Sequence, residues 1–149
     1  MVLVLLVLRL KKSEVIIDGK IKQYSYLKEN KDIKTVRLIF NNFIQLGSSR
    51  YVTQYLANNG IKTVNNKFFY DKSVKAILRN PVYCTADKDS FDYFKQKNSD
   101  ICFNKTDFHK NLGIMAFNRH NLQYENKFNQ KSKWVIALEK HERIISGKD

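Results

Sequence analysis

The spacing of the hydrophobic residues changes at Asp32, and this change constrains what the first half of the chain can fold into. Before it, two apolar stretches within residues 13–26 flank Asp18-Gly19, a dipeptide typical of hairpin turns. After it, apolar residues recur at intervals of three and four, as on one face of a helix. They are Ile33, Val36, Phe40, Phe43 and Ile44. We predict a β-hairpin and then an amphipathic helix over residues 32–46, which Gly47 ends.

Two shorter helices are expected next. Ser48 or Ser49 can cap a second helix, which the Asn-Asn-Gly sequence at residues 58–60 ends. Asp71 can cap a third helix over residues 72–79, and Pro81 ends it because proline disfavours a helical conformation in the residue before it. Between these helices, residues 61–69 alternate weakly around an Asn-Asn pair, which predicts a short hairpin or loop.

The second half of the chain carries weaker signals. Residues 90–97 can form a short helix, and residues 113–117 and 133–138 favour strands. We find no internal repeat and no long linker, so we expect one domain over residues 1–149, in which residues 1–12 fit poorly. The predicted fold class is α+β and mainly helical, with a helix-turn-helix-like arrangement of helices and short β-hairpins.

The first residues, MVLVLLVLRL, are apolar but do not form a membrane or export signal. A bilayer-spanning helix needs about 20 apolar residues. A signal peptide needs a basic start and a cleavage site with small residues, and neither is present. We therefore expect a cytoplasmic protein without a membrane partner.

The chain carries a large excess of positive charge, with 27 Lys and Arg against 14 Asp and Glu and a net charge of +13. Such a surplus repels itself in a folded domain and is typical of proteins that bind a polyanion. Nucleic acid is the first candidate and an anionic membrane surface the second. A bias toward lysine without any function would produce the same numbers.

The cysteines and histidines show no metal-binding pattern. Cys84 and Cys102 lie far apart without a CxxC motif, and the three histidines are scattered. We expect two reduced thiols, no metal, no cofactor and no small-molecule substrate.

The third predicted helix has two different faces. Val74, Ile77 and Leu78 form an apolar stripe, and a separate, mostly cationic stripe runs from Lys72 to Arg79. A recognition helix needs this division, because one side is anchored while donors on the other reach phosphates and base edges in the major groove. Many exposed helices also have a basic face, so the pattern alone does not decide. The candidate DNA-binding residues, on this helix and flanking it, are Arg50, Lys62, Lys67, Lys72, Ser73, Lys75, Ala76 and Arg79.

A series of motifs in a fixed order connects residues 36–83. They read VRLIF at 36–40, LGSS at 46–49, YLANNGIKT at 55–63, SV at 73–74 and ILRNPVY at 77–83. The series resembles the "recombinase" DNA-binding domain of large serine recombinases, the integrases and transposon resolvases of mobile elements. Further segments, ADKD at 86–89, YF at 93–94 and HERIIS at 141–146, resemble a subgroup found in conjugative transposons. The first ten residues do not resemble the family.

The resemblance implies that the chain recognises one half of an attachment site in double-stranded DNA, with residues 72–79 in the major groove. In the family, a resolvase-like domain supplies the nucleophilic serine, and a zinc-binding domain and a coiled coil commonly follow. No segment of this sequence matches them. The resemblance therefore implies a chain that is not an enzyme on its own and whose partner is a catalytic domain in the full-length protein. Ser48, Ser49 and Ser73 are interpreted as caps and phosphate donors, since none has an identifiable base partner.

Two other interpretations remain open. A stand-alone winged-helix transcription regulator would contain the same helices and hairpin, but it would dimerise and recognise a palindrome, whereas a recombinase fragment would bind one half-site as a monomer. A membrane-surface or interaction domain would bind anionic vesicles better than DNA at matched ionic strength.

Overall fold

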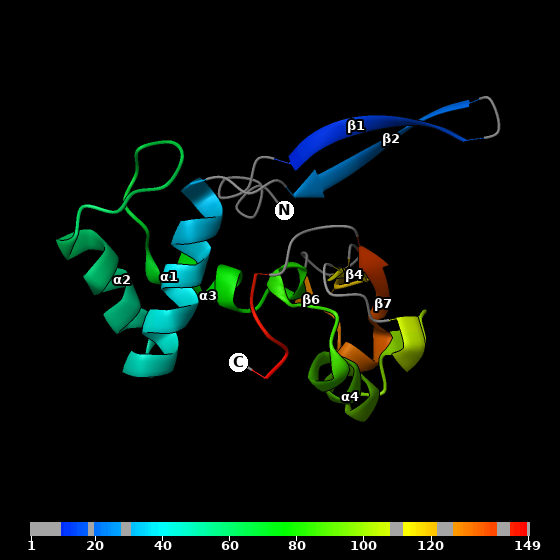
Figure 1. The fold of residues 1–149 in the computed structure, drawn as a ribbon. Coiled ribbons are helices and arrows are strands. Elements are labelled where there is room, and N and C mark those ends of the chain that lie inside the picture. Colours follow the sequence, from blue (N-terminus) through cyan, green and yellow to red (C-terminus); the bar gives the residue numbers. More distant parts are fainter. Residues whose placement is uncertain are drawn as a thin grey trace. The chain divides into compact units, whose positions relative to one another are not determined.

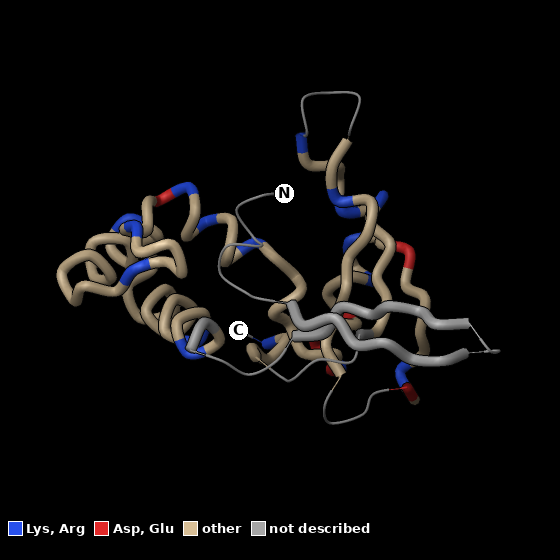
Figure 2. Tube along the Cα trace, turned by 90° about the horizontal axis from the view of Figure 1, so that it is seen from above, with Lys and Arg blue, Asp and Glu red and all other residues tan. Residues whose placement is uncertain are grey.

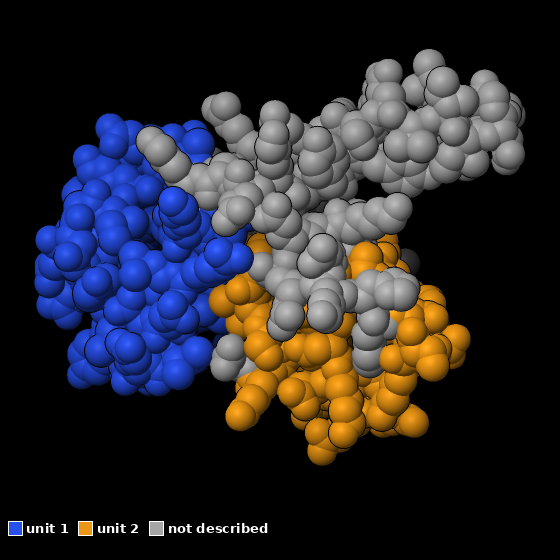
Figure 3. Space-filling model, in the orientation of Figure 1, with its two compact units in different colours: residues 1–80 blue, residues 81–149 orange. Residues whose placement is uncertain are grey.

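The computed structural model describes residues 10–17, 20–27, 31–107, 112–121, 127–139 and 144–148. These residues form helices and short strands in an α+β arrangement that is mainly helical, as predicted (Figure 1). The chain divides into two compact units, residues 1–80 (unit 1) and residues 81–149 (unit 2), shown in Figure 3. Of the poorly fitting segment 1–12, residues 1–9 lie outside the described residues.

Unit 1 contains the predicted hairpin. Strand β1 (Leu10–Ile17) pairs antiparallel with β2 (Lys20–Leu27), in a register that joins Leu10 to Leu27 and Ile17 to Lys20. This register leaves two residues between the strands, the loop length expected for an Asp-Gly turn. Those two turn residues themselves lie outside the described ranges.

Helix α1 (Lys31–Leu46) confirms the helix predicted over residues 32–46. Gly47 ends it with a φ of 66°, and its N–H donates to the carbonyl oxygen of Phe43 at 2.8 Å. This left-handed conformation is one that glycine adopts without steric cost.

The buried face of α1 differs from the predicted one. Its buried residues follow one another at steps of three, so the buried line rotates by about 60° per step around a helix of 3.6 residues per turn. By the end of the helix that line has moved away from Ile44, which is 56% exposed, and Phe43 is 36% exposed. The prediction that these two belong to the buried face was wrong. The buried residues are Ile33, Val36, Ile39 and Asn42.

Helices α2 (Ser49–Asn58) and α3 (Asp71–Leu78) complete the core of unit 1, and each contacts α1 and the other. Val52 and Leu56 are the apolar residues that α2 buries, and α3 buries Val74 and Ile77. These four side chains are at most 2% exposed. Their packing holds α3 in place from one side.

Unit 2 contains helix α4 (Lys88–Gln96) and a three-stranded sheet of order β3-β7-β4. Strand β3 (Asp100–Ile101) is parallel to β7 (Val135–Glu139), which is antiparallel to β4 (Gly113–Phe117). A second pair, β5 (His120–Asn121) and β6 (Lys127–Phe128), is antiparallel. Short 3-10 turns span Pro81–Tyr83, Lys105–Asp107 and Lys131–Lys133. The buried core consists of Ala86, Phe94, Ile114, Trp134 and Ile136.

The elements predicted for unit 2 are present with small shifts. The strand over residues 113–117 is confirmed, and the one predicted over 133–138 is β7. The helix predicted over 90–97 begins two residues earlier, because Asp87 caps it and accepts from the Ser90 N–H at 2.9 Å.

The two cysteines are free and differ in environment, with Cys84 half-buried and Cys102 exposed. Burial, and then the negative charge of Asp87, raise the pKa of Cys84 to about 12. Because the thiolate is the reactive form, on the order of one Cys84 in 10⁴ is reactive at pH 8. We expect a thiol reagent at pH 8 to label Cys102 rapidly and Cys84 only after unfolding. Two equal rates in the folded protein would contradict this assignment.

Candidate nucleic-acid interface

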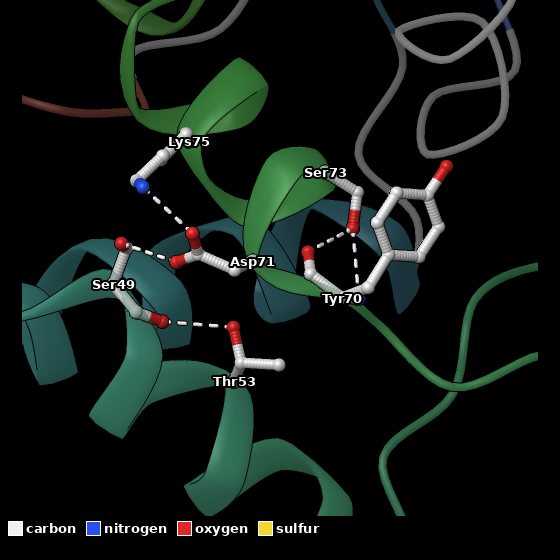
Figure 4. Close-up of polar contacts among 6 residues, drawn as sticks. All are labelled: Ser49, Thr53, Tyr70, Asp71, Ser73 and Lys75. Carbon is white, nitrogen blue, oxygen red and sulfur yellow. Dashed lines mark hydrogen bonds and ion pairs between the residues drawn. The ribbon is translucent and has the colours of Figure 1, made fainter.

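Helix α3 begins differently from the prediction. Tyr70, not Asp71, occupies the N-cap position, and Asp71 is the first helical residue. The Ser73 hydroxyl accepts the Tyr70 N–H at 3.1 Å and donates to the Tyr70 carbonyl oxygen at 2.6 Å (Figure 4). Ser73 therefore satisfies the backbone at the helix start, and the Asp71 side chain is left for other contacts.

The two faces of α3 separate as predicted. Val74 and Ile77 are buried, and Leu78 is half-buried. On the other side Lys72, Lys75 and Arg79 are exposed, with Ala76 half-buried among them. Ser73 differs from the rest of the candidate set, because it is only 6% exposed and its hydroxyl bonds the helix's own backbone.

Asp71 joins α2 to α3. Its carboxylate accepts from the Ser49 hydroxyl at 2.5 Å and pairs with Lys75, whose Nζ lies 2.6 Å from Oδ2 (Figure 4). The hydrogen bonds from Lys75 and Ser49, and the nearby charge of Arg50, lower the pKa of Asp71. The group is therefore an ionised carboxylate between two cations of the candidate set, one on each helix. The prediction that Asp71 caps α3 was wrong because these contacts engage its side chain.

The start of α2 likewise uses its serines in different ways. Ser48 occupies the N-cap position with an extended backbone, but its side chain forms no capping hydrogen bond. Ser49 is buried within the first turn, and its carbonyl oxygen accepts from the Thr53 hydroxyl at 2.8 Å (Figure 4). The position of the predicted cap is confirmed for Ser48, while the Ser49 hydroxyl serves the contact between helices.

The segment between α2 and α3, predicted as a short hairpin or loop, folds into a small hairpin. Lys62 and Phe68 form an antiparallel bridge, and the Thr63 N–H donates to the Lys67 carbonyl oxygen at 2.8 Å. Asn66 turns the chain with a φ of 59°. The Lys62 ammonium lies 5.1 Å from the centroid of the Phe68 ring, which is 55% exposed. The hairpin thus presents Lys62 and Lys67 beside an exposed aromatic ring.

Lys and Arg occur on both parts of the described chain, but few Asp and Glu lie among them in the part that carries these elements (Figure 2). Residues 1–80 contain 15 Lys and Arg against 5 Asp and Glu, whereas residues 81–149 contain 12 against 9. Over residues 33–80 there are eight cations and a single carboxylate, that of Asp71. Sequence reasoning missed Asp71 as part of the site, although its isolation among cations was a signal that could have revealed it.

The structure places six of the eight candidate residues on exposed positions of α2, the hairpin, and α3 with its C-cap. They are Arg50, Lys62, Lys67, Lys72, Lys75 and Arg79. Two cations lie on α3 and a third, Arg79, is its C-cap residue. Of these three, only Lys75 forms an ion pair within the described part of the chain. Lys72 and Arg79 therefore present their charges to solvent. In the described ranges, no three His, Cys, Asp or Glu residues gather closely enough to hold a metal ion.

Comparison with known proteins identifies a family. The family model described as Recombinase matches residues 30–149, which include α1, α2, α3 and all of unit 2. The match contains every segment on which the resemblance to serine recombinases rests, and it confirms that resemblance. No curated protein and no solved structure was found to match the chain.

Proposed function

Because the chain belongs to the Recombinase family, we propose that it binds double-stranded DNA as the attachment-site-recognising domain of a serine site-specific recombinase. The observation that carries this proposal is the geometry of α3, whose Val74 and Ile77 are buried while Lys72 and Arg79 are exposed. Family membership does not favour the stand-alone transcription regulator.

In the proposed complex α3 lies in the major groove. Its buried face is fixed by α1 and α2, so the cations opposite keep one orientation relative to the duplex. Arg79 has a guanidinium that can bond both acceptors on a guanine edge, and Lys72 suits a phosphate as a point charge. Arg50 and the two hairpin lysines contact the backbone and set the position without reading sequence.

We propose that α2, the hairpin and α3 act together as a helix-turn-helix-like element with a longer connection. A standard motif joins its helices by a turn of about 3–4 residues, whereas here residues 59–70 separate α2 from α3. The hairpin in this connection places Lys62 and Lys67 on one projecting element. It therefore acts as a second contact with the duplex beside α3.

The chemistry of strand exchange is proposed to reside in a resolvase-like domain of the full-length protein. The two buried serines near the interface, Ser49 and Ser73, donate their hydroxyl protons to Asp71 and to the Tyr70 carbonyl oxygen. Ser49 is 8% and Ser73 6% exposed, so these hydrogen bonds suit structural roles. Because the proposed partner is DNA, we propose that the protein acts in the cytoplasm. None of the helices in the described ranges is long and apolar enough to cross a bilayer.

Removing the two unpaired cations of α3 tests the proposal. The double variant Lys72→Ala/Arg79→Ala is expected to bind a random-sequence duplex about 60-fold more weakly at 0.1 M salt. On random DNA, where no guanine edge is selected, both side chains contact phosphates, and each lost contact costs about 0.9 logarithmic units. Fluorescence anisotropy with a labelled duplex measures the affinity.

A matched control exists on α4. Lys88 and Lys95 are exposed and have the same seven-residue spacing, so Lys88→Ala/Lys95→Ala removes the same net charge. We expect this variant to bind within about twofold of the unmodified chain. Equal losses in the two variants would show that net charge, not α3, determines binding.

A further inference from the structure

Asp71 places a negative charge on the surface of unit 1 that is proposed to bind DNA. Binding to the negatively charged DNA backbone gains nothing from such a charge. Asp71 is the single acid among eight cations over residues 33–80. It also lies in the first turn of α3, four residues before Lys75. A carboxylate at such a place repels phosphate and so lowers the affinity for any duplex.

Each carboxylate oxygen of Asp71 has its own partner. The Ser49 hydroxyl on α2 holds one carboxylate oxygen at 2.5 Å, and Lys75 lies 2.6 Å from the other. Asp71 thereby occupies the Lys75 ammonium in the same way that a phosphate oxygen would. Lys72 and Arg79, on the same face, have no such carboxylate partner within the described residues.

Resting on the proposed function, we propose that Asp71 is a specificity-determining residue that acts as an internal substitute for DNA phosphate. The ion pair with Asp71 keeps Lys75 from binding phosphates whose positions vary. Lys75 leaves Asp71 only when DNA offers it a partner in a fixed position that replaces the ion pair. On random DNA, where contacts are adaptable and mobile, Lys75 stays with Asp71. At the attachment site, α3 is seated in one register and Lys75 gains a fixed partner. The ion pair therefore lowers the affinity for non-specific DNA. It thereby raises the ratio of specific to non-specific affinity, which determines where the protein binds.

The inference is tested by measuring how many phosphates the protein neutralises on random-sequence DNA. Asp71→Asn keeps an oxygen that can accept from Ser49 but removes the charge that holds Lys75. With a random-sequence duplex of 20 base pairs as the probe, we expect the plot of log K against log salt to steepen by about 0.9, equal to one more neutralised phosphate. At 0.1 M salt this corresponds to about eightfold tighter binding. Adding Lys75→Gln to this variant is expected to abolish the gain in slope.

Unit 2 offers a matched control in a second lysine–aspartate pair. Asp92 lies 2.7 Å from the Lys105 ammonium, with both side chains about half exposed. Asp92→Asn makes the same change in charge and also frees a lysine, yet we expect the slope to stay that of the unmodified chain. A gain equal to that of Asp71→Asn would overturn the inference.

The remaining outcomes separate the inference from the proposed function. If Asp71→Asn leaves the slope unchanged, or steepens it equally when Lys75 is replaced by Gln, the inference fails while the proposed function stands. If the unmodified chain does not bind the duplex at all, the proposed function fails and the inference fails with it. If circular dichroism shows that Asp71→Asn does not fold, single variants of the lysines test the inference instead. Lys75→Gln is then expected to flatten the slope less than Lys72→Gln, and an equal or larger effect overturns the inference.

Discussion

Raising the salt concentration from 50 to 200 mM is expected to weaken binding of a random duplex by about 500-fold. The five exposed cations that Asp71 does not hold would each neutralise one phosphate, and each contributes about −0.9 to the slope of log K against log salt. The total slope is about −4.5, so a fourfold rise in salt concentration lowers the binding constant by about 500-fold. The measurement is a series of anisotropy titrations at four or more salt concentrations. The five residues are Arg50, Lys62, Lys67, Lys72 and Arg79.

A membrane-surface role makes a different prediction for the same experiment. Anionic vesicles would then compete with the duplex effectively at matched ionic strength, because both attract the same positive charge. Under the DNA-binding account, vesicles compete weakly, since only the duplex matches the geometry of α3. A slope close to zero would remove the electrostatic part of the proposal.

Replacing Ile77 by alanine is expected to lower the free energy of unfolding by about 2–5 kcal/mol, the usual cost of truncating a buried aliphatic side chain. Ile77 is 2% exposed, on the face of α3 that packs within unit 1. Because the same face holds the cations in position, DNA binding should fall with stability. Urea unfolding followed by circular dichroism gives the free energy.

An exposed isoleucine of the same unit is the matched control. Ile44 lies on α1 and is 56% exposed. Ile44→Ala removes the same atoms but leaves no cavity, so its effect should stay within about 1 kcal/mol. If both variants unfolded at the same urea concentration as the unmodified chain, the buried face of α3 would be assigned wrongly.

Local patterns in the sequence were sufficient to predict most of the regular elements. The hairpin β1–β2, helix α1 with its stop at Gly47, and strand β4 all follow from spacing and turn residues within a few positions. The division of α3 into a buried and a cationic face was also predictable. With a helical period of 3.6, its eight residues can be divided into an apolar and a polar face in few ways.

Features that depend on residues distant in sequence were not predictable. Asp71 was expected to cap α3 because it is a good capping residue, but the Ser49 hydroxyl, 22 residues away, and Lys75 engage its carboxylate. The drift of the buried line along α1 reflects how that helix packs on its neighbours. Strand β3 has only two residues and pairs in parallel with β7 more than 30 positions later, so no periodicity could reveal it.

Comparing the salt slopes of two double variants decides whether the exposed face of α3 binds duplex DNA. For Lys72→Ala/Arg79→Ala we predict a slope shallower by about 1.8 than that of the unmodified chain, because two phosphate contacts are absent. For Lys88→Ala/Lys95→Ala, with the same charge and spacing removed from α4, we predict no change. If the slope became shallower by the same amount in both variants, the exposed face of α3 would not be the DNA-binding surface.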